Sequence, residues 1–168
     1  MTAISLYQAS TPVFIKFLTN LSEIMKKAEA SAAERKIDLS VFVESRLAPD
    51  MFPFKKQVQI ATDAAKGAAA RLAGSEIPSF PDAETTWPEL QERIAKTIAY
   101  LKTIPAEKID GNEGRDIVIN YPDGRKFEFK GLEFLTNRAL PNFFFHITTA
   151  YDILRHNGVQ IGKADYLG

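Results

Sequence analysis

The chain has 168 residues, a length that fits one domain with a substantial hydrophobic core. Its 21 Lys and Arg balance its 21 Asp and Glu, and this zero net charge argues against broad electrostatic binding to nucleic acid or an anionic membrane. The absence of cysteine excludes disulfides, thiolate zinc sites and a cysteine nucleophile.

The N-terminal residues 1–8 lack the basic region and apolar run of a signal peptide. No segment approaches the ~20 apolar residues that a membrane span needs. The lack of cysteine is compatible with a reducing compartment. We therefore expect a cytoplasmic protein with no membrane or nucleic-acid partner.

The first helical pattern covers about residues 4–34, where apolar residues recur at helical spacing. Thr11 and Pro12 fit an N-cap and a first helical position. Alternatively, a turn through Leu6 and Tyr7 continues the helix, with a bend at Pro12. Residues 41–46 are expected to form a short helix.

A second helix is expected from Phe54 to Leu72, with Gly74 as its stop. It has a face of small residues, which allows close packing against other helices. The proline-containing residues 75–87 indicate a loop. A third helix should begin at Thr86, because Glu89 completes a capping box, and should end by Pro105.

Two alternating runs, 116–121 and 125–130, flank Pro122, Asp123 and Gly124, and this pattern predicts a β-hairpin. A lone hairpin is marginally stable, so it should pack on a helix. Residues 132–138 are expected to be helical, whereas residues 159–168 show no regular pattern.

The stretch 140–158 predicts a central helix that begins at Pro141 and ends at Gly158. It is apolar on most sides, and the run of phenylalanines at 143–145 is expected to lie in the core. Its mid-helix histidine, His146, should therefore be buried or lie in a cleft.

Together these elements predict an all-α fold, a four-helix bundle with a small β-hairpin between the third and fourth helices. One domain would cover residues 1–168. The long loops between the first and second helices and between the third and fourth leave the connectivity open.

Several motifs resemble a bacterial family of unknown function within the DinB/YfiT-like superfamily. They are RLAPDMFPF (46–54), QVQIATDAAKG (57–67), LPNFFFH (140–146) and TAY…LRHNG (149–158). The resemblance covers nearly the whole chain and implies a DinB-like bundle that is often a homodimer. Many DinB-like proteins hold nickel or zinc with three histidines, one on the second helix and two on the last as His-x-x-x-His. Characterised relatives include thiol-dependent transferases and hydrolases.

The chain departs from this three-histidine pattern, because it contains only two histidines. His146 matches one member of the pair, but Asn142 stands four residues before it. The second helix has no histidine, and Gln59 and Asp63 lie near the position of its ligand. His156 lies ~15 Å further along the helix, so it cannot share an ion with His146, and we expect it to be a solvated helix-end residue.

The candidate metal ligands are therefore His146, Asn142, Asp63 and Gln59, with nickel or zinc as the divalent metal. No metal at all is an equally open expectation. The same residues can instead form a buried polar network in which His146 donates to Asp63 or an amide. A metal-free active site is the third alternative.

Four further polar residues can line a cleft, although each is more often a surface or capping group: Tyr7, Asp50, Lys66 and Arg138.

For function, we expect an uncharacterised DinB-like bundle protein with a degenerate metal-type polar site around His146. The sequence leaves open whether it is an enzyme. One alternative is a divalent-metal-dependent hydrolase or thiol transferase. The other is a non-catalytic protein that binds a small molecule or acts through a homodimer surface.

Overall fold

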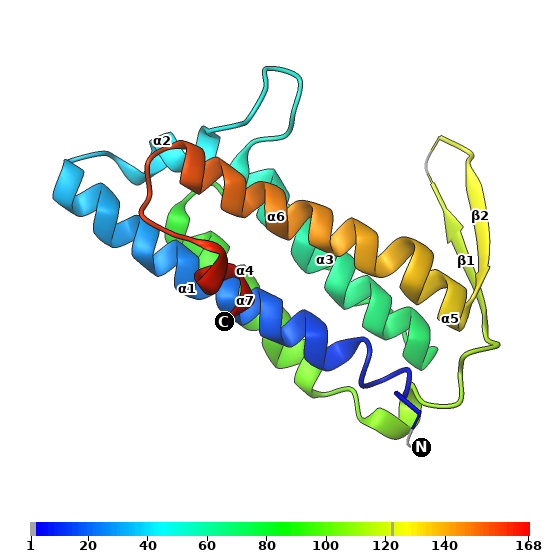
Figure 1. Ribbon diagram of the computed structural model, residues 1–168. Coiled ribbons are helices and arrows are strands. Elements are labelled where there is room, and N and C mark those ends of the chain that lie inside the picture. The colour runs from blue at the N-terminus through cyan, green and yellow to red at the C-terminus, as the bar shows by residue number, and fades with distance from the viewer. Residues whose placement is uncertain (1–2, 122) are drawn as a thin grey trace.

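The computed structural model of the protein describes residues 3–121 and 123–168. Met1, Thr2 and Pro122 lie outside the described residues, so the predicted Pro-Asp-Gly turn is described only from Asp123 onward. The four long helices are α1 (Thr11–Arg35), α3 (Phe54–Ala73), α4 (Trp87–Lys102) and α6 (Leu140–His156). They lie along one another with the hairpin at one end, as Figure 1 shows, and this confirms the predicted all-α four-helix bundle with a β-hairpin.

The order of the helices around the bundle follows from their contacts. Helices α1 and α3 occupy opposite corners, and among the long helices each packs mainly against α4 and α6. Helices α1 and α6 run parallel, because Phe14 packs on Phe143 near the start of both, and Arg35 donates to the Asn157 carbonyl near their ends.

Helices α3 and α4 also run parallel. Their first residues, Phe54 and Trp87, stack with ring centroids 5.2 Å apart, and Asp63 meets Arg93 further along both helices. Because α4 starts beside the start of α3, the intervening segment 74–86 must return along the bundle. We call this segment the crossover loop.

The predicted small-residue face of α3 is confirmed. Ala61, Ala65 and Ala69 are fully buried, and Ala68 is nearly so. Side chains this short let neighbouring helices approach closely. The helix ends at Gly74, whose φ of 66° is the left-handed conformation that glycine adopts at low cost.

Helix α1 starts one residue before Pro12 and follows a turn through Leu6 and Tyr7, whereas α2 starts two residues before its predicted start at Val41. Helix α1 has Ser10 rather than Thr11 at its N-cap position, and the Ser10 hydroxyl donates to the Leu6 carbonyl in the preceding turn. Helix α2 (Leu39–Glu44) starts where the Asp38 carboxylate accepts from the Ser40 N–H at 2.8 Å. The predicted start of α4 is correct, since the Thr86 N–H donates to Glu89 at 2.9 Å.

The hairpin pairs β1 (Asp116–Asn120) with β2 (Lys126–Lys130) in antiparallel register. A short 3-10 turn (Ala106–Lys108) precedes it. The next residues form α5 (Gly131–Phe134) and a π-helical turn (Leu135–Ala139) that runs directly into α6.

The central helix starts at Leu140, one residue before the predicted start at Pro141, and the helical segment predicted at 132–138 leads directly into it. The backbone at Ala139 is already helical, with φ −67° and ψ −54°. Proline has no N–H to donate to the preceding turn, and the wider π-turn, closed by the Leu140 N–H and the Leu135 carbonyl, carries the helix past this gap.

The C-terminal residues are also more regular than predicted. They include the single-turn helix α7 (Lys163–Leu167), which lies against α1 in Figure 1. Tyr166 packs on Phe17 and its carbonyl accepts from the Asn20 amide at 2.9 Å. None of the helices in the described part of the chain is both long and apolar enough to cross a membrane.

The phenylalanine run of α6 is only partly in the core. Phe143 is completely buried, Phe144 is half-buried and Phe145 is 56% exposed. The expectation that all three are core residues is wrong for Phe145, because α6 sits at a corner of the bundle and keeps one face toward solvent.

Replacing Phe143 with alanine should lower the free energy of unfolding by about 3–5 kcal/mol, because it leaves a cavity beside Phe14. Phe145→Ala is the matched control, with an expected change within about 0.5 kcal/mol. Urea unfolding of both variants measures this difference, and similar losses would contradict the packing described here.

Candidate functional site

His146 in α6 and Gln57 in α3 form a buried polar pair between two helices. The His146 Nδ1 lies 2.7 Å from the Gln57 Oε1, and the residues are 8% and 1% exposed. The Gln57 Nε2 donates to the Phe52 carbonyl at 2.9 Å. The prediction that His146 is buried is confirmed, and its partner is an amide from the second long helix.

The Phe52 carbonyl determines the tautomer of His146. A carbonyl oxygen can only accept, so the Gln57 nitrogen faces Phe52 and the Gln57 oxygen faces the imidazole. The His146 Nδ1 must then carry the proton and donate. In the neutral ring, Nε2 holds a lone pair, and it makes no hydrogen bond to any residue of the described chain.

Burial lowers the pKa of His146 to about 4, because the apolar surroundings disfavour the imidazolium ion. The Phe145 ring stands edge-on to the imidazole at 5.1 Å and contributes to this cover. Near neutral pH the side chain is thus an uncharged acceptor. A pKa this low makes it a weak general base, since efficient proton transfer favours a pKa near the working pH.

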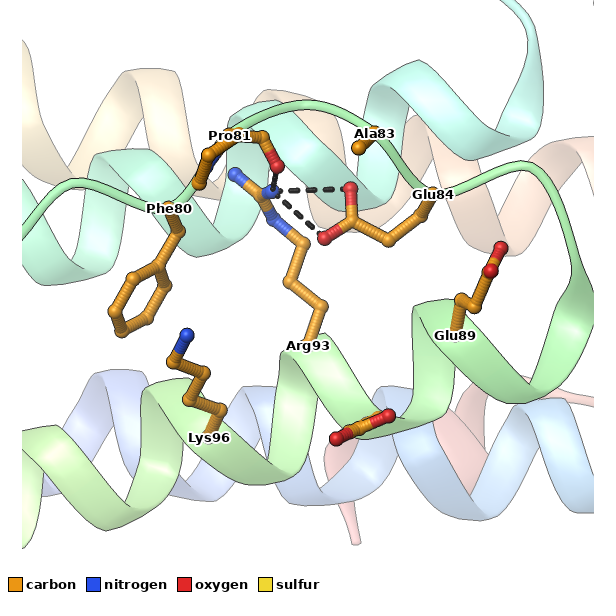
Figure 2. Close-up of a pocket in the computed structure, with 8 residues that line it drawn as sticks. Phe80, Pro81, Ala83, Glu84, Glu89, Arg93 and Lys96 are labelled. Carbon is orange, nitrogen blue, oxygen red and sulfur yellow. Dashed lines mark hydrogen bonds and ion pairs between the residues drawn. The ribbon is translucent and has the colours of Figure 1, made fainter.

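A second polar cluster surrounds Arg93, which is 3% exposed. Its guanidinium donates hydrogen bonds to four groups and forms an ion pair with a fifth, Asp82. The partners are Thr62 (2.8 Å), the Pro81 carbonyl (3.0 Å), Glu84 (3.0 Å), Asp63 (2.9 Å) and Asp82 (3.0 Å). Figure 2 shows the guanidinium reaching from α4 to Pro81 and Glu84.

Gln59 and Asp63 belong to this Arg93 cluster. The Gln59 amide donates to Glu84 at 3.0 Å, and the Asp63 carboxylate also pairs with Lys66 at 2.9 Å. Successive residues turn by about 100° around a helix, so Gln57 faces α6 while Gln59 and Asp63 face α4. The structure therefore joins His146 to neither of these two candidates.

The Arg93 cluster fastens the crossover loop to the bundle. Three of its partners, Pro81, Asp82 and Glu84, belong to that loop. Phe80 lies between two ammonium groups, 4.1 Å from Lys66 and 4.2 Å from Lys96, and the Lys96 side is visible in Figure 2. A pocket of about 260 Å³ lies beside Phe80. Arg93 lines this pocket, but its guanidinium already has oxygen partners from the chain.

Asn142 lies in a third place, a pocket of about 260 Å³ beneath the hairpin. It shares this pocket with Arg71, Tyr121 and Arg138. Asn142 is one helical turn before His146, so the two side chains follow one another along the same face of α6.

The four other polar residues that could line a cleft lie in different parts of the structure. Arg138 lines the pocket beneath the hairpin, and Lys66 is buried beside Asp63. Tyr7 donates its N–H to Asp110, and Asp50 is exposed on the loop before α3. His156 is exposed at the end of α6, as predicted.

Sequence reasoning missed Arg93 and Arg71. Arg93 stands between Leu90 and Thr97 at helical spacing, on a face that is otherwise buried. A charged residue on an apolar helix face indicates a buried ion-pair site, and this pattern could have identified Arg93 from the sequence. Arg71 carries no such signal, because its surroundings come from the distant hairpin.

The candidate ligands do not fit a three-histidine metal cage. Within residues 3–121 and 123–168, no three His, Cys, Asp or Glu side chains are grouped so that they could hold an ion. The Asp63 carboxylate is shared by two cations, and His146 and Asn142 add only one imidazole and one amide. Metal binding at His146 stays a prediction.

Comparison with known proteins places this bundle among the DinB-like proteins. A crystal structure of a DinB family member protein from Shewanella denitrificans is 46% identical, with a TM-score of 0.90, over 97% of this chain and 92% of that one. Residues 6–167 match the model of a domain of unknown function, DUF1993, and the chain belongs to that family. No curated protein matches the chain. The resemblance seen in the sequence is confirmed.

The low pKa of His146 predicts a pH-dependent stability. The folded protein binds this proton less readily than the unfolded chain, so stability present above pH 6.5 is lost as the pH falls toward about 4. The loss should be on the order of 3 kcal/mol. Denaturant unfolding at several pH values measures it, and His146→Gln, which keeps a donor for Gln57, should remove this component. An identical pH dependence in both proteins would contradict the assignment.

Arg93→Met should lower the free energy of unfolding by about 3 kcal/mol, because Asp63, Asp82 and Glu84 lose their shared cation. Amide hydrogen exchange should accelerate in the crossover loop. Lys102→Met is the control, since Lys102 is exposed in the last turn of α4, away from the loop. Unchanged exchange in the Arg93 variant would show that the loop is held by other contacts.

Proposed function

We propose that the protein is a small-molecule-binding bundle whose site centres on His146. The observation that carries this proposal is the relay from the Phe52 carbonyl through Gln57 to His146. It holds the imidazole in one tautomer and leaves the Nε2 lone pair for a group outside the described chain. A ligand hydroxyl or N–H would donate to it.

The surroundings of His146 support a binding role. Phe52 and Phe145 are 57% and 56% exposed, and both adjoin the relay, one through its carbonyl and one through its ring. An exposed aromatic ring such as Phe145 beside a single oriented polar atom is typical of ligand sites, where apolar contacts give affinity and the polar group gives orientation. The pKa of about 4 favours this role over proton transfer.

A divalent metal is the alternative occupant, because an imidazole oriented through its other nitrogen is also typical of metal ligands. Elemental analysis of tag-free protein, with nickel and zinc titrations by calorimetry, distinguishes a metal site from a small-molecule site. We expect well below one equivalent of metal and no saturable uptake. One equivalent that disappears in His146→Ala would contradict the proposal and favour a metal-dependent hydrolase or thiol transferase.

Ligand binding is tested directly by saturation-transfer NMR with phenol and benzyl alcohol, two neutral probes that carry a hydroxyl donor. Both should bind the wild-type protein, and His146→Leu should lose this binding because it removes the acceptor. The second histidine provides the matched control, since His156→Gln changes an exposed residue at the helix end. Equal binding to the His146→Leu variant, or binding of neither probe at millimolar concentration, would refute the proposed site.

A homodimeric interaction protein is the second candidate, because the exposed Phe52 and Phe145 rings would also suit a contact with a second copy. Sedimentation equilibrium tests it. Phe145→Ser should then shift the protein toward monomer, whereas Phe127→Ser in the hairpin should not. A wild-type protein that is monomeric at all concentrations would remove this candidate.

A further inference from the structure

The pocket beneath the hairpin has an unusual charge for a neutral chain. It is formed where β1 and the residue after it meet α3, the π-helical turn and the start of α6. Two arginines, one tyrosine and two asparagines line it together with four apolar residues. No Asp or Glu is among the described residues that line it, so the pocket carries two positive charges and no negative one.

Burial of the Arg71 guanidinium carries a desolvation cost that only its interaction with Tyr121 offsets in part. Its guanidinium lies back along α3 over Gly67, where an added Cβ would be 2.6 Å from Nη1. It forms no ion pair or side-chain hydrogen bond with any described residue, although burial lowers its pKa. A half-buried guanidinium with free donors is a costly arrangement unless an anion binds there.

Arg138 is oriented toward the same pocket by the hairpin. Its Nη2 donates to the Tyr121 hydroxyl at 2.5 Å, which uses one of its donors and leaves the others open. Asn142, one turn further along α6, adds an amide that can donate. These groups come from α3, the end of β1, the π-helical turn and α6, so only the folded chain brings them together.

We propose that this pocket is an oxyanion site that binds a small carboxylate or phosphate through Arg71 and Arg138, with Asn142 as a further donor. Guanidinium groups match the planar spacing of both oxyanions and bind them with charge-assisted hydrogen bonds. Ile119 and Phe134 provide an apolar wall, which suits a compact organic body attached to the anion. The site is distinct from the His146 relay and does not depend on its occupant.

Calorimetric titration with benzoate, phenyl phosphate and inorganic phosphate at low salt tests the proposal. At least one of the three should bind saturably, and the affinity should fall as chloride is added. Arg71→Gln and Arg138→Gln should each weaken binding at least about tenfold. Arg155→Gln removes an exposed arginine at the far end of α6 and should leave the affinity unchanged.

Thermal unfolding provides a second readout that keeps the test independent of folding defects. Arg71→Gln should unfold at the same temperature as the wild type or higher, since it removes a desolvated charge without a described partner. Added benzoate or phosphate should raise the wild-type melting temperature but not that of the double variant Arg71→Gln/Arg138→Gln.

Absence of binding by all three anions, or equal affinity in the Arg71, Arg138 and Arg155 variants, would overturn the assignment. Tight binding of only phenyl phosphate or phosphate would identify the oxyanion as phosphate rather than carboxylate.

Discussion

The close packing of α3 against its two neighbours is the constraint on which the rest of the structure depends. The alanines of α3 are buried so completely that α4 and α6 approach its backbone closely. That approach places Gln57 against His146 on one side of the helix and Asp63 against Arg93 on the other. A larger residue at Ala61 or Ala65 would separate the helices and weaken both polar contacts together.

The two polar clusters of α3 then have different consequences. Because α3 and α4 run parallel, the crossover loop must travel back along the bundle, and Arg93 holds it there through Pro81, Asp82 and Glu84. In that cluster Arg93 is surrounded by partners from the chain itself, so its role is structural. The His146 relay and the pocket around Arg71 are instead incomplete: one leaves a lone pair and the other leaves guanidinium donors for an external group.

Local sequence signals predicted the long helices, the capping box at Thr86, the hairpin and the burial of His146, because each depends on nearby residues. They did not predict which residues His146 meets. The rotation of α3 relative to α6 is set by packing across the bundle, and it selects Gln57 over Gln59 or Asp63. The parallel course of α3 and α4 and the π-turn before Pro141 were equally inaccessible, since both result from distant contacts rather than local preference.

The central claim is that His146 is a neutral imidazole with its proton on Nδ1 and an open Nε2. Nitrogen-15 NMR of the imidazole, recorded across pH in a His156→Gln background so that one histidine remains, tests it most directly. The account predicts a protonated Nδ1, an unprotonated Nε2 at neutral pH and titration at about pH 4. A proton on Nε2, or titration near pH 6.5, would contradict it.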